Sequence, residues 1–224
     1  MAAKKLNLPD TASVAHPGAD GRLHAPSANR NAPVIRKTIL EHAGISGTAL
    51  EIASGTGEHV TMLAQALPGF SWQPTDIDSD RIMSIANWIR HSECKNILSP
   101  AILDATRAGW EKEYSGYDLI LMVNLLHLID TDGARGVVEG ISKSLAPGGA
   151  AMIYGPFLRG DDFASDGDAA FHKSLVDQNS AIGYKSFQTV QGWQASSGLM
   201  TKPAITMPAN NLILVARKPA QPAT

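Results

Sequence analysis

A short run of small residues directly follows an apolar stretch and is the first candidate for chemistry in this chain. It reads Ala53-Ser54-Gly55-Thr56-Gly57, and the apolar stretch TALEIA leads into it. Small residues let the backbone turn sharply and approach a ligand closely. The residues after the turn, 58–67, have a helical pattern, so a helix N-terminus is expected to point at the same place. The glycine turn, residues 53–57, therefore predicts a nucleotide-like ligand.

The spacing of the glycines argues against a pyrophosphate in this turn. Dinucleotide folds use the fingerprint G-x-G-x-x-G, with the pyrophosphate on the helix N-terminus. Here Gly57 is followed by Glu58, His59 and Val60, so the third glycine is missing. The Glu58 carboxylate would also repel a pyrophosphate. A nicotinamide-dependent oxidoreductase is therefore disfavoured, and a ligand without phosphates fits better.

Acidic residues end the next two predicted strands. Asp76 follows the turn by about twenty residues, where a carboxylate can accept hydrogen bonds from both hydroxyls of a ribose. Asp104 ends the third strand, where it can accept from an adenine amino group, with the backbone of Ala105 as a donor. An acid after a strand more often caps a helix when it is taken alone. The ordered set of a turn, a ribose acid and a base acid is the pattern of an S-adenosylmethionine (SAM) site.

Strands and helices alternate from residue 48 onward, which predicts a parallel sheet with right-handed crossovers. The closing segment, 199–219, predicts a hairpin that turns at Pro208–Asn210, because it has no room for a helix. One antiparallel strand should therefore join an otherwise parallel sheet. The predicted strands are 48–53, 70–76, 96–104, 117–126 and 150–157, and the predicted helices are 31–43, 58–67, 80–90, 132–145, 167–178 and 188–197.

Length and composition indicate one domain. The 224 residues suffice for a full hydrophobic core. Residues 1–28 lack periodicity and are rich in Ala, Pro, Gly and Asp, so they predict a flexible or loosely docked arm. Residues 29–219 form the expected domain, and 220–224 form a tail.

Charge, hydropathy and cysteine content limit which partners and which cellular location are expected. The net charge of −2 lacks the basic excess that is typical of nucleic-acid-binding proteins, so no nucleic acid is expected. No apolar run approaches the roughly 20 residues that span a bilayer, so no membrane is expected. Cys94 is the one cysteine, which excludes an internal disulfide and fits a cytoplasmic protein. The oligomeric state is left open.

The motifs together resemble the class I SAM-dependent methyltransferases and, more narrowly, the DUF938 family, also called the methyltransferase-like 26 group. The resemblance implies an α/β, Rossmann-like fold with a seven-stranded, mostly parallel sheet, an antiparallel C-terminal strand and helices on both faces. It also implies SAM contacts at Gly55, Gly57, Asp76 and Asp104. Ala53 stands where a first glycine is commoner, and alanine is small enough for the same turn. The matching segments run from about Ala25 to Lys218 and are APSANRNAPVI, LEIASGTGEHV, WQPTDID, NLLHLI, LAPGG, YGPF and MPANNLILV.

Methyl transfer from a sulfonium is an in-line displacement, so the protein mainly positions the reactants and sometimes supplies a base. The acceptor should meet SAM at the carboxyl end of the fourth strand, in the run VNLLHLID. Asn124 can orient the methionine part of SAM or the acceptor. His127 is a candidate general base or acceptor ligand, and the alternative is a histidine that packs or caps the next turn. Tyr154 is the second candidate for a catalytic role.

Further residues are candidates for binding. Arg30, which precedes the expected first helix, can pair with the methionine carboxylate, and His59 can bond the same group. Glu51 can reach the SAM ammonium through a water or can order the turn. An exposed arginine and a helix-surface histidine are the alternatives. The candidates for the acceptor pocket are Tyr154, Phe157, Arg159 and Asn210, although asparagine is also a common turn residue.

The leading functional hypothesis is methyl transfer from SAM to an oxygen, sulfur or nitrogen atom of a small molecule. The alternatives are a methyltransferase of RNA or protein and a SAM-binding protein without catalysis. The charge balance argues against RNA, whereas a non-catalytic binder would need the same site. The acids of residues 161–168 do not match a calcium loop, so no metal is expected.

Overall fold

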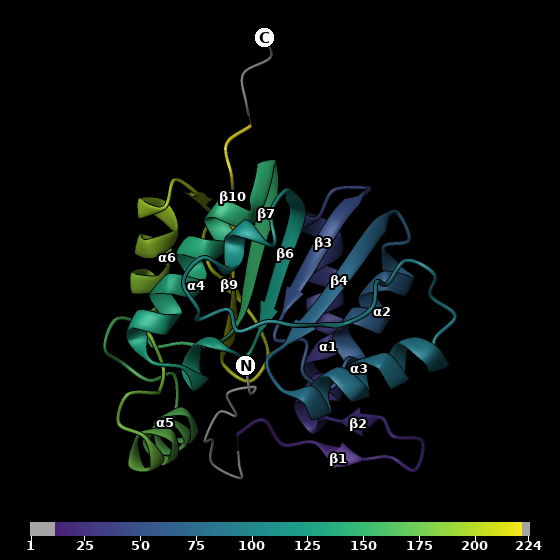
Figure 1. Ribbon diagram of the computed structural model, residues 1–224. Helices are drawn as coiled ribbons and strands as arrows, with labels where there is room; N and C mark the ends of the chain where they lie inside the picture. The colour runs from purple at the N-terminus through teal and green to yellow at the C-terminus, as the bar shows by residue number, and fades with distance from the viewer. Residues whose placement is uncertain (1–11, 221–224) are drawn as a thin grey trace.

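A central sheet with helices on both faces forms the described part of the chain (Figure 1). The computed structural model describes residues 12–220. Hydrogen-bonded neighbours run in the order β5-β4-β3-β6-β7-β10-β8, and β9 also pairs with β10. The strands are β3 (Gly47–Ile52), β4 (Phe70–Asp76), β5 (Ala101–Ile102), β6 (Tyr117–Val123), β7 (Leu145–Pro156), β8 (Met200–Thr201), β9 (Ile205–Thr206) and β10 (Asn211–Arg217).

The α/β, Rossmann-like sheet that the sequence predicts is confirmed. The pairs among β3 to β7 are parallel, whereas β10 is antiparallel to β7. The sheet has eight strands where seven are expected, because the segment before β10 pairs with it twice, as β8 and as β9. The helices are α1 (Pro26–His42), α2 (Glu58–Ala66), α3 (Ser79–His91), α4 (Thr131–Ser144), α5 (Asp166–Gln178) and α6 (Phe187–Ser196).

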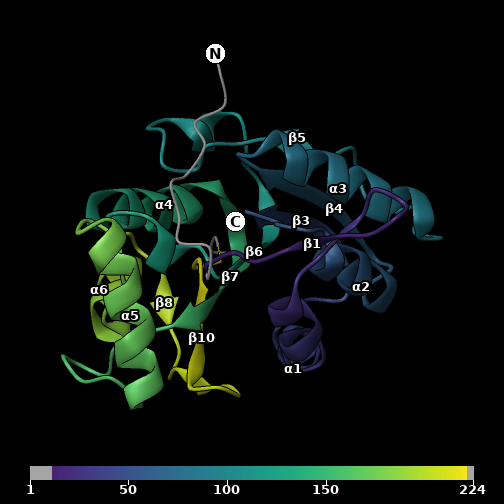
Figure 2. The same cartoon turned by 90° about the horizontal axis from the view of Figure 1, so that it is seen from below.

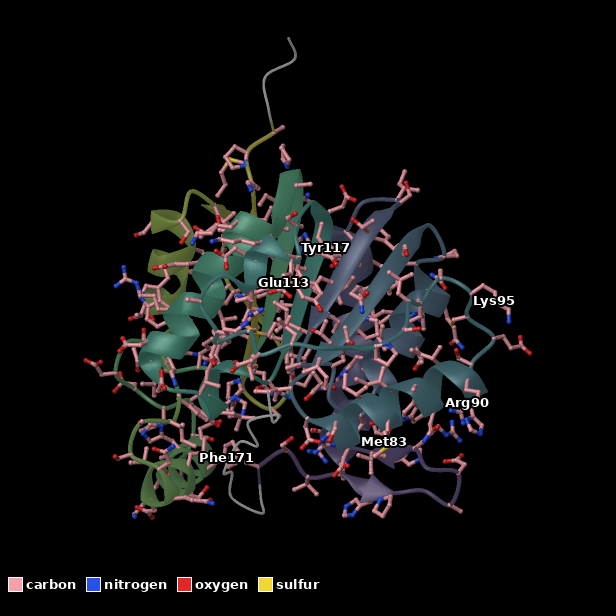
Figure 3. All side chains as sticks on the ribbon, in the orientation of Figure 1. Met83, Arg90, Lys95, Glu113, Tyr117 and Phe171 are labelled. Atoms are coloured by element: carbon pink, nitrogen blue, oxygen red, sulfur yellow. The ribbon has the colours of Figure 1, made fainter. Side chains whose placement is uncertain are left out.

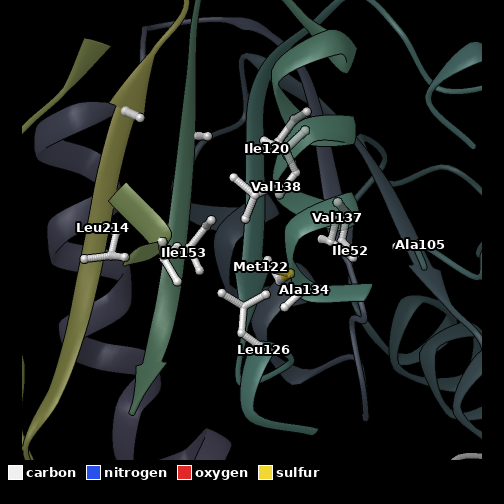
Figure 4. Packing of buried hydrophobic residues seen from close by; sticks show 14 of the residues in the cluster. Ile52, Ala105, Ile120, Met122, Leu126, Ala134, Val137, Val138, Ile153 and Leu214 are labelled. Carbon is white, nitrogen blue, oxygen red and sulfur yellow. The ribbon is translucent and has the colours of Figure 1, made fainter. Parts of the chain in front are cut away.

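Two hydrophobic layers cover the two faces of the sheet. Side chains alternate along a strand, so Leu119 and Leu121 of β6 face the layer of α1, α2 and α3, whereas Ile120 and Met122 face α4 and α6. Figure 4 shows the second layer, where Val138 of α4 lies over the strands. Each such fully buried side chain contributes about 1.5–3 kcal/mol. The packing holds the carboxyl ends of β3, β4 and β6 side by side.

Three elements begin well away from the residue expected from sequence, and β6 ends at Val123 instead of residue 126. The third strand is interrupted: Ile97 pairs with Trp72 in an isolated bridge, and β5 begins after Pro100, which cannot donate to the ladder. Strand β7 begins at Leu145 instead of residue 150, so the run LAPGG lies in the strand. Helix α1 begins at Pro26 instead of residue 31, with proline in its first turn, where no amide hydrogen is needed.

The chain before α1 lies against the rest of the fold. Strands β1 (His16–Pro17) and β2 (Leu23–His24) pair in antiparallel fashion, and the Leu23 carbonyl of β2 accepts from the Trp88 indole of α3. Helix α1 therefore takes three residues of the arm expected over 1–28, and residues 12–25 have defined contacts. Residues 1–11 of that arm and 221–224 of the expected tail lie outside the described residues.

Candidate active site

A cavity of about 750 Å³ lies at the carboxyl ends of β3, β4 and β6. Parts of the chain that are distant in sequence form its walls: residues 12–14 and 25–30, the glycine turn, the ends of β4 and β6, and the start of α5. In a parallel sheet of this kind, ligands bind at the carboxyl ends of the strands. The residues predicted from sequence that line it are Arg30, Ala53, Gly55, His59, Asp76, Asn124 and His127.

The glycine turn uses left-handed backbone at alternate residues. Ala53, Gly55 and Gly57 have φ values of 55°, 59° and 98°. A Cβ on Gly57 would lie 2.9 Å from the Cα of Ile85, whereas a Cβ on Gly55 would meet nothing within 4 Å. Gly57 is therefore required by packing against α3, and Gly55 presents a bare backbone to open space.

Asp76 is joined to the glycine turn. The amide of Gly55 donates to its Oδ2 (2.9 Å), and the amide of Asp78 donates to its Oδ1 (3.0 Å). Burial raises the pKa of this carboxyl, and the two backbone bonds oppose the rise. Each carboxylate oxygen has a second lone pair. Asp76 is thus a fixed carboxylate that lines the cavity and still has acceptor capacity.

Glu51 lies behind the turn with its side chain buried. It is 1% exposed, and its Oε2 has no hydrogen-bond partner among residues 12–220. Burial raises its pKa to about 8, and the nearby Asp76 carboxylate adds to the rise. It does not line the cavity of the described residues, so contact with a ligand would need a bridging water.

His59 and Tyr154 meet around Asn31 of α1. The Nε2 of His59 lies 2.8 Å from the Asn31 Oδ1, and burial lowers the pKa of the imidazole to about 4. Tyr154 is 3% exposed and packs in the layer of α1. Burial raises the pKa of its hydroxyl, beside which lie the amides of Asn31 and Asn211. Arg30 is exposed and lines the same side of the cavity.

The end of β6 contributes Asn124 and His127. Asn124 has a left-handed backbone with φ of 57°, and its backbone N–H donates to the Tyr154 carbonyl (2.9 Å). His127 is 6% exposed and packs edge-on against Phe171 (5.9 Å between ring centroids) and Tyr184 (6.1 Å). Burial and the nearby Lys185 cation lower the pKa of His127 to about 3. The imidazole is therefore neutral at neutral pH, and the same burial makes it a weak base.

The family model described as "Protein of unknown function (DUF938)" matches residues 22–218. The chain belongs to the DUF938 family. The narrower assignment to the methyltransferase-like 26 group stays a prediction.

Solved structures share the fold of this DUF938 protein. One is an O-methyltransferase family protein from Burkholderia thailandensis (TM-score 0.75, 16% identity, covering 88% of this chain and 57% of that one). An O-methyltransferase family 2 protein from Planctomyces limnophilus, in complex with apigenin, has a TM-score of 0.72 at 20% identity (86% and 58% covered). Human N-acetylserotonin methyltransferase in complex with SAM has a TM-score of 0.66 at 16% identity (84% and 52% covered). The chain thus spans little more than half the length of each, and the likeness shows that it shares their Rossmann-like fold.

The α5 side of the cavity of the DUF938 protein contains residues that sequence reasoning missed. Phe171, labelled on α5 in Figure 3, lines the cavity with Tyr184 and Asp168. The Tyr184 hydroxyl donates to the Asp168 Oδ1 (3.2 Å). The buried Lys185 donates to the carbonyls of Ile129 and Gly183, which fastens this wall to the turn that carries His127. No spacing in the sequence links residues 168–184 to the strand ends.

Several site residues that the sequence predicts lie outside the lining of the cavity that residues 12–220 form. Asp104 accepts hydrogen bonds from the amide and hydroxyl of Thr106. Arg159 donates to the carbonyls of Phe157 (2.6 Å) and Asn210 (2.8 Å), and Asn210 donates to the Asp168 Oδ2 (3.0 Å). The residues outside the lining are Glu51, Gly57, Asp104, Ala105, Tyr154, Phe157, Arg159 and Asn210. Their proposed roles remain predictions.

The described residues contain neither a cluster of metal-ligating side chains nor a membrane-spanning helix. Within 12–220, no three or more His, Cys, Asp or Glu side chains gather as a metal would need. Over the same range, no helix has the length and apolar character to cross a membrane.

Proposed function

We propose that this DUF938 protein is a SAM-dependent methyltransferase that acts on a small molecule. The Asp76 carboxylate supports this most, because Gly55 and Asp78 fix it where β3 and β4 end at the cavity. A carboxylate so placed suits the two hydroxyls of a ribose. The fold shared with methyltransferases supports the same ligand.

The charges around the cavity also favour SAM over a nucleotide with phosphates. The charged residues of its lining are Asp76, Asp78, Asp168, Arg30 and Arg81. SAM carries a sulfonium, an ammonium and one carboxylate, so it suits a slightly acidic cavity, whereas a pyrophosphate does not. The open space at Gly55 fits close approach of the ligand to the turn.

The chain's residues divide the work of binding in this proposal. Arg30 and His59 lie on the side expected for the methionine carboxylate, and Glu51 serves the ammonium through a water. Asp104 and Ala105 would bind the adenine, and Gly57 and Ala53 shape the turn. Asn124 orients the methionine part or the acceptor.

SAM, when bound, supplies a methyl group on a positively charged sulfur. His127 is the proposed base because it lines the cavity. It would accept the proton that an oxygen, nitrogen or sulfur acceptor loses. General-base help is typically worth about 10²–10⁴-fold in rate when the pKa of the base lies near the working pH, and the lowered pKa of His127 places it at the weak end of this range. Tyr154 is the second candidate for the base. Its hydroxyl lies beside the side chain of Asn211, and Asn211 lines the cavity.

The size of the cavity supports a small acceptor. About 750 Å³ lies within the range of small-molecule sites, and here it must hold the cofactor as well. We place Phe157, Arg159 and Asn210 around the acceptor, with Phe171 and Tyr184 as aromatic walls. The Planctomyces relative, whose structure contains apigenin, accords with such an acceptor. We also propose a cytoplasmic protein without nucleic-acid or membrane partners.

Calorimetric titration with SAM and S-adenosylhomocysteine tests this function. Asp76→Ala should weaken binding at least about tenfold, because hydrogen bonds to a charged group are worth about 1.5–3 kcal/mol. Asp132→Ala, at an exposed position of α4, is the matched control and should bind as the wild type does. Equal binding by Asp76→Ala would refute the ribose role, and no binding by the wild type would refute the function.

Transfer of radiolabelled methyl from SAM then separates the alternatives. Label should appear in small thiols, phenols or carboxylic acids. Label in added RNA or protein alone would favour a macromolecular methyltransferase. Tight SAM binding without any transfer would favour a non-catalytic SAM-binding protein.

A further inference from the structure

Two side chains join the N-terminal wall to the glycine turn. This wall is residues 12–28, of which 12–14 and 25–28 line the cavity. The Leu23 amide donates to the Ser84 Oγ (2.8 Å), and that hydroxyl donates to the Thr56 carbonyl (2.7 Å). The Ala25 amide donates to the Glu58 Oε2 (2.8 Å), which also accepts from the Thr56 hydroxyl (2.7 Å). Thr56 is thus connected twice to the N-terminal wall.

The N-terminal wall spans the cavity. At one end Ala12 packs with Leu175 and Tyr184 on the α5 side. At the other end Ala25 and Ala28 line the cavity beside the glycine turn. Figure 2, seen from below, shows the segment with β1 crossing in front of the strands. A ligand in the cavity would therefore lie between this wall and the sheet.

The same wall is held mainly by hydrogen bonds and only slightly by buried side chains. Of residues 12–28, only Ala12 and Ala28 are buried. Its hairpin pairs two residues with two residues, and such a hairpin is marginal without other support. Segments with few buried apolar contacts open most readily. The geometry thus combines a covered cavity with a cover that buries little apolar surface.

We propose that the N-terminal wall is a lid over the cofactor and that Glu58 and Ser84 couple its closing to the glycine turn. This inference rests on the proposed SAM function. A ligand seated on the turn fixes Thr56, which then holds the Ser84 hydroxyl and the Glu58 carboxylate where the amides of Leu23 and Ala25 need acceptors. Glu58 and Ser84 are positioning residues and do not touch the ligand.

Other contacts of the lid provide a matched control. The Asn87 side chain donates to the Gly21 carbonyl (2.7 Å), and the Trp88 indole donates to the Leu23 carbonyl (2.9 Å). The Arg22 guanidinium lies 4.5 Å from the centre of the Trp88 ring. These contacts attach the lid to α3 without passing through Thr56. Their loss should loosen the lid but leave the coupling intact.

The test is amide hydrogen exchange of the full chain, with and without saturating S-adenosylhomocysteine. The ligand should slow exchange at Leu23 and Ala25 by about fivefold or more, the lower range of measured couplings. In the double variant Ser84→Ala/Glu58→Leu, which removes both connections to Thr56, this ligand effect should fall below about twofold at both amides. In Asn87→Ala, exchange should be faster in both states while the ligand effect is kept.

The outcomes separate the lid from the proposed function. Calorimetric heat on adding S-adenosylhomocysteine shows whether it binds at all. Binding without any change at Leu23 and Ala25 of the wild type would overturn the lid and leave the methyltransferase standing. Absence of binding would remove both. Loss of the ligand effect in Asn87→Ala would overturn the coupling through Thr56, and the wild-type comparison decides about the lid even if a variant fails to fold.

Discussion

The buried carboxyl of Glu51 should make the ligand-free protein less stable as the pH rises. Burial raises the pKa of this group from 4.5 to about 8. Between these values the folded protein keeps the proton that the unfolded chain has released. The contribution of Glu51 is therefore fully present below about pH 4.5 and is lost progressively as the pH rises through about 8.

Glu51→Gln gives the magnitude, because glutamine cannot ionise and nearly keeps the shape. One pKa unit corresponds to about 1.4 kcal/mol. Between pH 5 and pH 7 the folded wild type holds one more proton than the unfolded chain over about two pH units. The free energy of unfolding of the variant minus that of the wild type should therefore increase by about 2–3 kcal/mol from pH 5 to pH 7.

Urea unfolding at pH 5, 6, 7 and 8 measures this difference. Glu41→Gln, at an exposed position of α1, controls for the loss of one carboxyl group. The contributions of the buried His59 and His127 to the pH dependence of stability are the same in both proteins and cancel in the comparison. If the difference in the free energy of unfolding between Glu51→Gln and wild type does not change with pH, the reasoning is refuted. It is also refuted if the wild type becomes more stable relative to the variant as the pH rises.

Two more predictions concern the turn and the proposed base. Gly57→Ala, with φ of 98° and a Cβ 2.9 Å from the Ile85 Cα, should lower the free energy of unfolding by more than about 2 kcal/mol. Gly55→Ala should lower the free energy of unfolding by only about 1–2 kcal/mol but should weaken the binding of S-adenosylhomocysteine. A larger loss of stability in Gly55→Ala than in Gly57→Ala would contradict the assignment of Gly57 to packing and of Gly55 to the ligand. The imidazole proton shifts of His127, identified by their loss in His127→Asn, should stay constant from pH 5 to pH 8, because the pKa is lowered to about 3. A titration midpoint within that range would show that the ring is more hydrated than its burial indicates.

The order of elements could be predicted because each carries a local pattern. Strand β4 spans the predicted residues 70–76, where apolar residues lead into Asp76. The turn and Asp76 could be paired because parallel strands bring their carboxyl ends together. These features need only short stretches of sequence and one rule of topology.

The parts that sequence reasoning missed depend on contacts between distant segments. Tyr154 faces the α1 layer, whereas Ile153 beside it faces α4, and a strand that is apolar on both faces does not show which side is which. The N-terminal wall has little apolar periodicity, because its contacts are hydrogen bonds to Ser84 and Glu58. The α5 wall joins the site through Tyr184, far along the chain from His127.

The margins of the sheet bear on how the protein behaves at high concentration. One margin is β5, which has only two residues and follows Pro100. At the other, the outer side of β10 is covered by β8, β9 and the Lys202 amide, which donates to the Val215 carbonyl (2.9 Å). Unpaired strand edges are where sheets of separate molecules join and aggregate. With short strands on both margins, this sheet offers little backbone for such growth, so its long apolar strands stay within one molecule.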